Sequence, residues 1–325
     1  MNDRTCTFLP PLLSPILPMR TILPSDLSHR DRHQLLLSGV SPRPIAFVTS
    51  VDAEGNVNLS PFSFYNAYAS NPPIVAIGPA IAAKTGLAKH TWLNILATGE
   101  CTISAVSYSM VHSMNLTSAA FASDVDEYAK AGFTKRPSVV VAPPSVAESP
   151  YTMECRLIEN IELRRDIGGN GNLMLLEVVA FHVADTVMVN GRVDPRGMDL
   201  VGRMGDAYYT RTTELFEATQ PPHIPIGMDE LPYLIRTSTI LTGNELAQLA
   251  YVPVLPVLDG TFPQFEESFQ ADSIETELAC ERPQGALYVW LKNGNHEDRT
   301  TLHRIVQQYI RQGKIEEAWQ TLLLE

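Results

Sequence analysis

The sequence predicts a mainly β protein with short helices, in which an antiparallel barrel or sandwich is followed by a loop-rich and then helical C-terminal extension. Three observations lead to this fold class. Segments rich in Val, Ile, Leu and aromatic residues crowd residues 41–185, clusters of Gly, Pro and Asn separate them, and strands and helices do not alternate regularly there. Many strands joined by turns favour an antiparallel architecture over a doubly wound parallel sheet.

The segments predicted to be strands are 44–51, 56–64, 74–78, 101–107, 139–142, 152–163 and 172–184. The first two flank a turn at residues 52–55 and the last two flank a turn at 166–171, so each pair is expected to form a hairpin. The second turn is glycine-rich, but a dinucleotide-binding loop would open a helix, whereas this segment stands between two strands. It is therefore interpreted as a hairpin turn.

Short helices are predicted between the strands, and longer ones at the C-terminus. Thr91 is expected to cap a helix that ends at Gly99, because threonine is a common N-cap and glycine a common terminator. Further along the chain, Thr242 or Asn244 is expected to cap another helix. The remaining predicted helices are 110–114, 125–131, 298–312 and 314–324.

Composition divides the chain into three parts. Residues 1–20 are apolar but contain four prolines, and they are predicted to be a disordered extension rather than a signal peptide. Residues 21–220 hold the β-rich domain, and residues 221–325 form the predicted C-terminal extension, because loops and prolines dominate until the final helices. No apolar run approaches the roughly 20 residues that a membrane-spanning helix needs.

Charge and cysteine content exclude several classes of partner. The 325 residues carry a formal charge of -12 at pH 7, with a pI near 5.1, so nucleic acid or an anionic membrane surface would repel the chain. The four cysteines stand far apart without a CxxC pair, which argues against a zinc knuckle or a disulfide framework and indicates a cytoplasmic protein. Cys101 and Cys155 lie in strand-like runs and are expected to be buried thiols.

The histidines do not form a recognisable metal motif. His29 and His33 are four residues apart, but their segment lacks the Glu of a zinc protease helix and a third ligand. His182 lies in an apolar strand and is interpreted as a hydrogen-bonded core histidine, with a place beside a ligand as the alternative. The sequence also lacks a Walker loop and a nucleophile elbow. No metal ligand is therefore predicted.

The segment KHTWLNI, residues 89–95, predicts an anion site in an otherwise acidic chain. Thr91 stands at the expected start of a helix, where free backbone N–H groups attract negative charge, and Lys89 precedes it. A phosphate group suits such a place. An ordinary capped surface helix with an incidental lysine would explain the same residues.

The segment 58–66 combines small hydrogen-bonding groups with aromatic rings. Its polar members are Asn58, Ser60, Ser63 and Asn66, and its aromatic members are Phe62, Phe64 and Tyr65. The first two polar residues share one face of a strand, and the segment is too apolar for a solvated loop. This mixture suits a flat heteroaromatic ligand, whose edge needs hydrogen bonds and whose face needs a dry wall. A well-satisfied core turn is the alternative.

These residues belong to a longer series of motifs by which the chain resembles the flavin reductase-like family. The motifs are SPRPIAFVTSVD, NLSPFSFYNAYASNPP, KHTWLNI, AESPYTMECRL, LLEVVAFHV and VDPRGMDLVGRMGDAYYTR, in this order within residues 21–220. Several ordered matches are more specific than any one of them. The resemblance implies an antiparallel split β-barrel that binds FMN and works as a homodimer. The segment 224–250 is similar to an extension found in a long-chain subgroup.

The resemblance also implies which residues bind the flavin. It places the flavin phosphate near Lys89, Thr91 and Asn94, the isoalloxazine ring and ribityl chain along Asn58, Ser60, Phe62, Ser63, Phe64 and Asn66, and Arg43 at the barrel mouth. The phosphate position coincides with the anion site that the helix start predicts.

The activity that the resemblance implies is the reduction of FMN by NADH or NADPH, with transfer of a hydride to flavin N5 and supply of reduced flavin to an oxygenase. This mechanism needs no acid or base from the protein, so no catalytic side chain is predicted. An FMN-binding electron carrier or redox-sensing protein without nicotinamide oxidation is the alternative, and a barrel that has lost its flavin is a third. Fold resemblance does not separate them, because function depends on the site.

Overall fold

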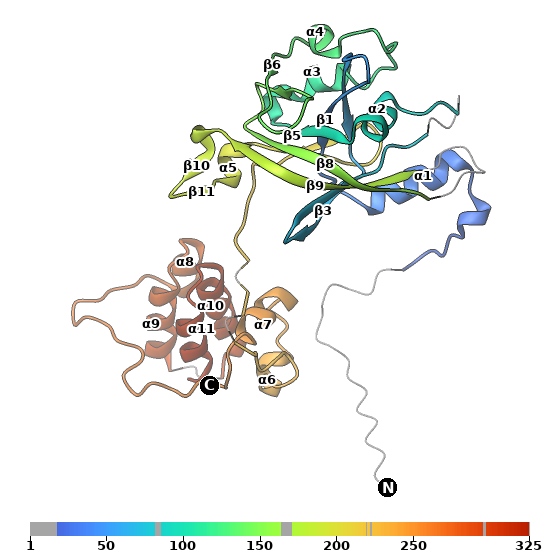
Figure 1. Cartoon of the computed structure of the whole chain (residues 1–325). Helices are drawn as coiled ribbons and strands as arrows, with labels where there is room; N and C mark the ends of the chain where they lie inside the picture. The colour runs from blue at the N-terminus through green and yellow to red at the C-terminus, as the bar shows by residue number, and fades with distance from the viewer. Residues whose placement is uncertain are drawn as a thin grey trace. The chain divides into compact units, whose positions relative to one another are not determined.

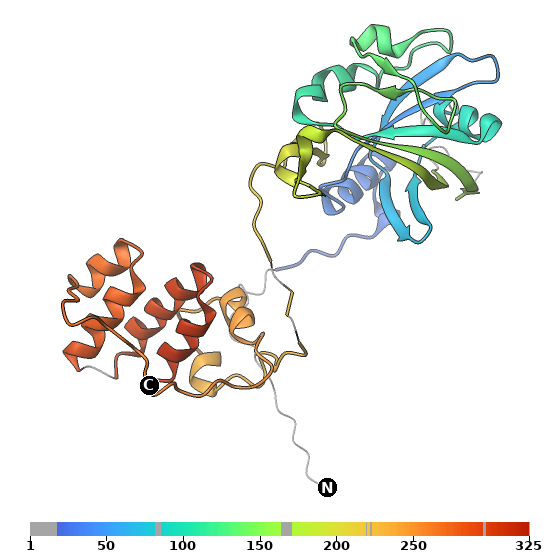
Figure 2. The same ribbon diagram turned by 60° about the vertical axis from the view of Figure 1, so that its left-hand side comes forward.

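The computed structural model describes residues 18–81, 86–163, 171–218, 220–221, 223–294 and 297–324. Contacts divide the chain into two compact units, of which one is Ile22–Phe216 and the other comprises Glu217–Glu325 together with Met1–Thr21. The first unit is built around a β-sheet and the second from helices (Figures 1 and 2). Most of the predicted N-terminal extension and of the turn at 166–171 lies outside the described residues. The predicted domain limits, 1–20, 21–220 and 221–325, stay predictions.

A seven-stranded sheet with the order β2-β1-β5-β8-β9-β4-β3 forms the first unit (Figure 1). Its strands are β1 (Ala46–Val51), β2 (Val57–Phe62), β3 (Tyr65–Ser70), β4 (Pro73–Ile77), β5 (Glu100–Ser104), β8 (Tyr151–Glu162) and β9 (Asn172–Val183). Every neighbouring pair is antiparallel, which confirms the predicted class. Small ribbons pair β6 (Lys135–Arg136) with β7 (Ser145–Val146), β10 (Met188–Val189) with β11 (Arg192–Val193), and β12 (Val201–Arg203) with β13 (Tyr209–Arg211).

The predicted hairpin formed by β1 and β2 is confirmed, with a register from Ala46 opposite Phe62 to Val51 opposite Val57. The carboxylate of Asp52 organises its turn by accepting backbone N–H groups at residues 54 and 56, at 3.1 and 2.7 Å. The predicted strand 56–64 is shorter than expected, because the chain bends at residues 63–64 and continues as β3.

The outer edge of β2 is closed by two different means. The backbone N–H of Leu59 points away from β1 and donates to Oε2 of the buried Glu127 at 3.1 Å. Hydrogen-bonded and non-bonded pairs alternate along antiparallel strands, so the residue two positions later has the same orientation. That residue is Pro61, which has no N–H to leave unpaired.

Both faces of this sheet are covered. On one face, Ala46 and Val48 of β1 pack in a core with Ile103, Met153 and other residues of β4, β5, β8 and β9. On the other face, Phe47 and Leu59 belong to a second core. The alternation of β1 side chains between the two cores follows from the twofold repeat of a strand. The expectation that Cys101 and Cys155 are buried is confirmed, since both are in the first core.

Short helices surround the sheet. They are α1 (His29–Gly39), α2 (His90–Thr98), α3 (Val111–Leu116), α4 (Glu127–Ala131) and α5 (Pro195–Met198), together with the 3-10 turns Pro24–Asp26, Tyr108–Met110 and Asp185–Val187. The helices predicted at 110–114 and 125–131 correspond to α3 and α4. Gly99 ends α2 with φ 75°, a left-handed conformation that glycine adopts readily, as predicted. Helix α1, capped by Ser28, was not predicted.

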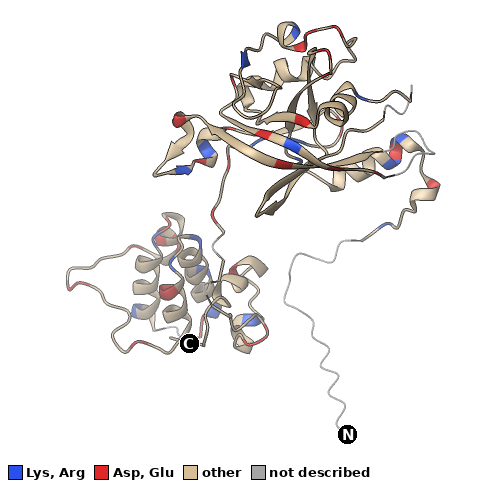
Figure 3. Cartoon of the chain, in the orientation of Figure 1, with Lys and Arg blue, Asp and Glu red and all other residues tan. Residues whose placement is uncertain are grey.

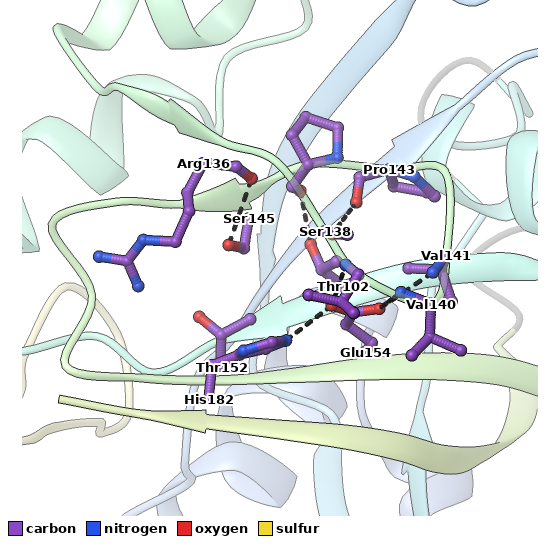
Figure 4. Close-up of polar contacts among 12 residues, drawn as sticks. Thr102, Arg136, Ser138, Val140, Val141, Pro143, Ser145, Thr152, Glu154 and His182 are labelled. Carbon is purple, nitrogen blue, oxygen red and sulfur yellow. Dashed lines mark hydrogen bonds and ion pairs between the residues drawn. The ribbon is translucent and has the colours of Figure 1, made fainter.

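The strand predicted at 139–142 is wrong, because these residues form a loop over β8. The N–H groups of Val139, Val140 and Val141 donate to the carboxylate of Glu154 instead of to a neighbouring strand. The same carboxylate contacts His182 of β9 (Figure 4). The expected hydrogen-bonded state of that histidine is confirmed, although its side chain is partly exposed rather than fully buried.

The second unit consists of helices around their own core (Figure 2). They are α6 (Tyr233–Arg236), α7 (Gly243–Leu249), α8 (Ile274–Ala279), α9 (Pro283–Asn293), α10 (Arg299–Arg311) and α11 (Ile315–Leu322). The buried rings of Trp290 and Trp319 are its largest core side chains. Thr242 caps α7 as predicted, and α10 and α11 confirm the final helix pair, separated by Gly313 with φ 74°.

Positions of Lys and Arg and positions of Asp and Glu occur in both units (Figure 3). Among the described helices, none is long and apolar enough to cross a membrane.

Candidate functional site

The start of helix α2 carries the segment predicted to bind an anion. Lys89 is its N-cap, with φ -74° and ψ 138°, and no side chain caps the helix. The prediction that Thr91 is the N-cap is wrong, because the N-cap lies two residues earlier, at Lys89, and the threonine hydroxyl contacts a strand. The N–H groups of His90 and Thr91 donate to no described residue. The next two N–H groups donate to the carbonyl oxygen of Lys89.

Strand β2 meets this helix through Asn58. Its Nδ2 donates to Oγ1 of Thr91 at 2.8 Å, and both side chains are buried. Because the hydroxyl accepts this bond, its own proton is available for a further acceptor. One turn later, Nδ2 of Asn94 donates to Oγ of Ser50 at 3.2 Å. The structure thus brings Asn58 and Thr91 together, and it turns Asn94 toward β1.

The predicted strip of polar and aromatic side chains follows one face of β2. Asn58, Ser60 and Phe62 alternate with residues of the opposite face, as a strand requires. Ser60 is half-buried and its hydroxyl bonds to no described residue, whereas Phe62 is buried in the core. The strip therefore leads from the start of α2 to the bend at residues 63–64.

Arg43 holds this bend in place. The residue is only 4% exposed. Burial lowers the pKa of the Arg43 guanidinium, but an arginine remains charged in a protein. The bonds that it donates reach the carbonyl oxygens of Leu37 (2.9 Å), Val40 (2.6 Å) and Met204 (3.0 Å) and Oγ of Ser63 (3.3 Å). One buried side chain thus ties the end of α1 and the end of β12 to the bend between β2 and β3.

A pocket of about 450 Å³, here named the corner pocket, lies at this bend. The predicted residues that line it are Arg43, Ser63, Phe64 and Asn66. Phe64 is 40% exposed, and Oδ1 of Asn66 accepts the N–H of the next residue at 2.9 Å. None of the described residues that line this pocket is an Asp or a Glu. The predicted site residues therefore fall into two groups, one at the corner pocket and one at the start of α2, with β2 between them.

Sequence reasoning missed the residues that the sheet brings to the corner pocket from other strands. Gly78 follows β4 and donates its N–H to the carbonyl oxygen of Phe64 at 2.7 Å. A Cβ at position 78 would lie 2.9 Å from Cβ of Phe64, so only glycine fits without a shift. Asn172 lines the same pocket from the start of β9. No local pattern marks either residue, because strand pairing alone places them there.

The arrangement can bind and orient a ligand, but it offers no obvious acid or base. Along the strip and in the corner pocket the polar groups are hydroxyls, amides and one guanidinium. Within the described ranges, no group of three or more His, Cys, Asp or Glu side chains is placed to hold a metal ion.

Known proteins share this fold and these motifs. The flavin reductase like domain matches residues 38–195. An uncharacterized protein of Halalkalibacterium halodurans is 35% identical over 204 residues, which are 61% of this chain and 95% of the relative.

Solved structures are similar as well. Nitrilotriacetate monooxygenase component B from Bacillus cereus is 32% identical with a TM-score of 0.59, and the match covers 62% of this chain and 100% of that one. The 2-nitrobenzoate 2-nitroreductase of Pseudomonas fluorescens is 27% identical with a TM-score of 0.57, over 63% and 98% of the two chains. A Shewanella frigidimarina structure assigned to the flavin reductases with a split barrel domain is 26% identical with a TM-score of 0.53, over 60% and 95%. This chain therefore belongs to the flavin reductase-like family, and its first unit has the split-barrel fold of that family.

Proposed function

We propose that this protein binds FMN along β2 and the start of α2 and reduces it with NADH or NADPH. The observation that carries the proposal is the uncapped start of α2, where two backbone N–H groups lie beside the hydroxyl of Thr91 and the exposed residue Lys89. Free backbone donors and a cation at a helix N-terminus suit a phosphate group. Membership in the flavin reductase-like family supports a flavin as the molecule that carries this phosphate.

The residues of the strip fit the rest of such a ligand. The start of α2, with Lys89, Thr91 and the two free N–H groups, is here named the phosphate seat. Asn58 fixes Thr91 in this seat. The hydroxyl of Ser60, which bonds to no described residue, is the next hydrogen-bonding group along β2. Ser63 and Asn66 would satisfy the polar edge of the flavin ring. Phe62 and Phe64 would form the dry wall beside it, and Arg43 holds Ser63 in position. Asn94 contributes by fixing α2 against β1.

The chemistry that FMN supplies when bound is acceptance of a hydride from NADH or NADPH at N5. The protein's part is to orient the ring, to exclude water from one face and to donate hydrogen bonds to its edge. Because the described lining of the corner pocket contains no carboxylate, we assign no side chain as a general acid or base.

We also propose an oxygenase partner and an oligomeric state for this protein. The likeness to component B of nitrilotriacetate monooxygenase supports a role in supplying reduced flavin to an oxygenase. We further propose a cytoplasmic homodimer, as the family resemblance implies. An FMN-binding electron carrier that does not oxidise a nicotinamide is the alternative function.

The absorption spectrum of the purified chain tests this proposal. Full-length protein is mixed with FMN, freed of unbound flavin, and titrated with NADH and with NADPH without oxygen. Bleaching of the flavin band by either nucleotide supports the reductase. Bound flavin that neither nucleotide bleaches supports the carrier, and a protein that retains no flavin contradicts both.

A further inference from the structure

A second cavity, of about 670 Å³, lies beside the corner pocket and is here named the tyrosine cavity. The two share Pro42, Arg43, Pro44 and Tyr65 as lining residues. Most of its remaining wall is apolar and comes from β5, β8 and the segment 193–202. A cavity of this size and lining is suited to an organic molecule of one or two fused rings.

Two tyrosines of this cavity have hydroxyl groups without a protein partner. Tyr65 begins β3 and Tyr151 begins β8, and both rings pack against the core of the first unit. Neither hydroxyl forms a hydrogen bond with any described residue. Burial, and then the neighbouring thiol of Cys155, raises the pKa of both hydroxyls, so each stays protonated and can donate. Both residues are only partly buried, so their hydroxyl groups are accessible and free to donate to a ligand in the cavity.

The charged and polar groups around the cavity indicate what kind of ligand the two tyrosine hydroxyls can bind. No Asp or Glu occurs among the described residues that line it, and the buried guanidinium of Arg43 lies at its border with the corner pocket. Of the three further hydroxyls that line the cavity, Ser104 pairs with Thr152 and Thr212 donates to a backbone carbonyl, whereas the hydroxyl of Thr210 bonds to no described residue. The cavity thus offers hydrogen-bond donors and positive charge, so a ligand has to bring the acceptors.

We propose that the tyrosine cavity binds a planar aromatic compound that carries carbonyl-type oxygens, with Tyr65 and Tyr151 as the donors that recognise them. The inference adds a class of substrate to the proposed function and rests on that function for its biological meaning. The binding itself requires only the side chains of this cavity. A second copy of the chain is the competing occupant of such an apolar surface.

Calorimetric titration of the full chain without flavin tests the inference. The two probes are 2-acetylnaphthalene, which has one carbonyl oxygen, and naphthalene, which has none. The carbonyl compound should bind more tightly, and Tyr65→Phe and Tyr151→Phe should each weaken its binding roughly fivefold, as expected for one lost hydrogen bond. Binding of naphthalene should not change. Tyr208→Phe is the matched control, because Tyr208 is 73% exposed and lies outside this cavity.

Three results would overturn the inference: no binding of either probe, equal affinity for both, or unchanged affinity of both Phe variants for 2-acetylnaphthalene. Sedimentation of the same samples tests whether a second copy of the chain occupies the cavity. If the probe binds only to monomers, the cavity is an interface with a second copy, and the inference is refuted. A parallel FMN titration separates this inference from the proposed function. Protein that distinguishes the probes but binds no FMN would refute the reductase and keep the cavity, and the reverse pattern would refute only the cavity.

Discussion

Oε1 of Glu154 lies 2.6 Å from Nε2 of His182, and the same carboxylate accepts three consecutive backbone N–H groups, from Val139, Val140 and Val141 (Figure 4). The carboxylate is fully buried, whereas the imidazole is 30% exposed. Four donors thus satisfy a group that would be costly to bury without them. This contact fixes the loop 139–141 to β8 and β9.

Removal of the negative charge should release this loop. Glu154→Gln keeps the size of the side chain but replaces one acceptor oxygen by a donor, so we expect a loss of about 2 kcal/mol in local stability. Hydrogen exchange of the amides of Val139, Val140 and Val141 should therefore become roughly 30-fold faster. Glu159→Gln on the same strand is the control, because Glu159 is exposed. Equal exchange in both variants would contradict the stabilising role of the carboxylate.

The same carboxylate predicts a loss of stability in acid. Burial raises the pKa of Glu154, but the N–H of Val139, the bond with His182 and the other two N–H groups lower it by more, so the net shift is downward. A carboxyl whose pKa is lowered by folding stabilises the protein above its unfolded pKa, about 4.3, and this contribution disappears as the pH falls through the folded pKa.

Urea unfolding can show this dependence. The buried thiols of Cys101 and Cys155 become reactive when the first unit unfolds, so their labelling by a thiol reagent that works in acid reports its midpoint. Between pH 5 and pH 3, the midpoint of the wild-type chain should fall by more than that of Glu154→Gln. Parallel curves would mean that this carboxyl does not titrate with unfolding.

A methyl group at Gly78 should disturb the corner pocket. In Gly78→Ala the new Cβ would lie 2.9 Å from Cβ of Phe64, so one of the two strands has to shift. Such overpacking costs about 1–3 kcal/mol, and we expect weaker FMN binding as well as lower stability. Fluorescence titration with FMN measures the first effect. Gly39→Ala is the control, since no atom lies within 4 Å of its added Cβ.

The phosphate seat can be tested by comparing two flavins. Lys89→Ala combined with Thr91→Ala removes a cation and a hydroxyl from the start of α2, so binding of FMN should weaken by roughly tenfold, whereas riboflavin, which lacks the phosphate, should lose much less. Equilibrium dialysis with each flavin gives both affinities. Lys130→Ala, an exposed lysine on α4, controls for the change in net charge. Equal losses for the two flavins would place the phosphate elsewhere.

The second unit has a separate stability determinant in its capping box. Oγ1 of Thr242 accepts the N–H of Glu245, and the Glu245 carboxylate accepts the N–H of Thr242 at 2.8 Å. Thr242→Ala should lower the free energy of unfolding by about 1 kcal/mol, and Thr242→Ser should restore most of it. Helical circular dichroism during heating measures both variants. A serine variant as unstable as the alanine variant would exclude the hydroxyl as the cause.

Features that depend on neighbouring residues could be predicted from the sequence. The hairpin turn at Asp52, the glycine end of α2 and the Thr242 cap each depend on a few adjacent residues. The strip on β2 could be predicted for the same reason, because alternation along one strand sets which side chains share a face.

Features that depend on distant residues could not be predicted. Val139, Val140 and Val141 are three successive valines, which favour a strand. They form a loop instead, because their N–H groups donate to the carboxylate of Glu154 on β8. Threonine is a common N-cap residue, but the hydroxyl of Thr91 accepts a hydrogen bond from Asn58, which lies 33 residues earlier in the chain. Gly78 and Tyr151 reach their cavities only through strand pairing.

The closed edge of β2 has a consequence for the behaviour of the protein at high concentration. An exposed strand with free N–H groups can recruit a strand of another molecule and start aggregation. Here one outward N–H is occupied by Glu127, and the next position is Pro61, which offers none. The edge of β2 at Leu59 and Pro61 is therefore protected against the addition of a strand from another molecule.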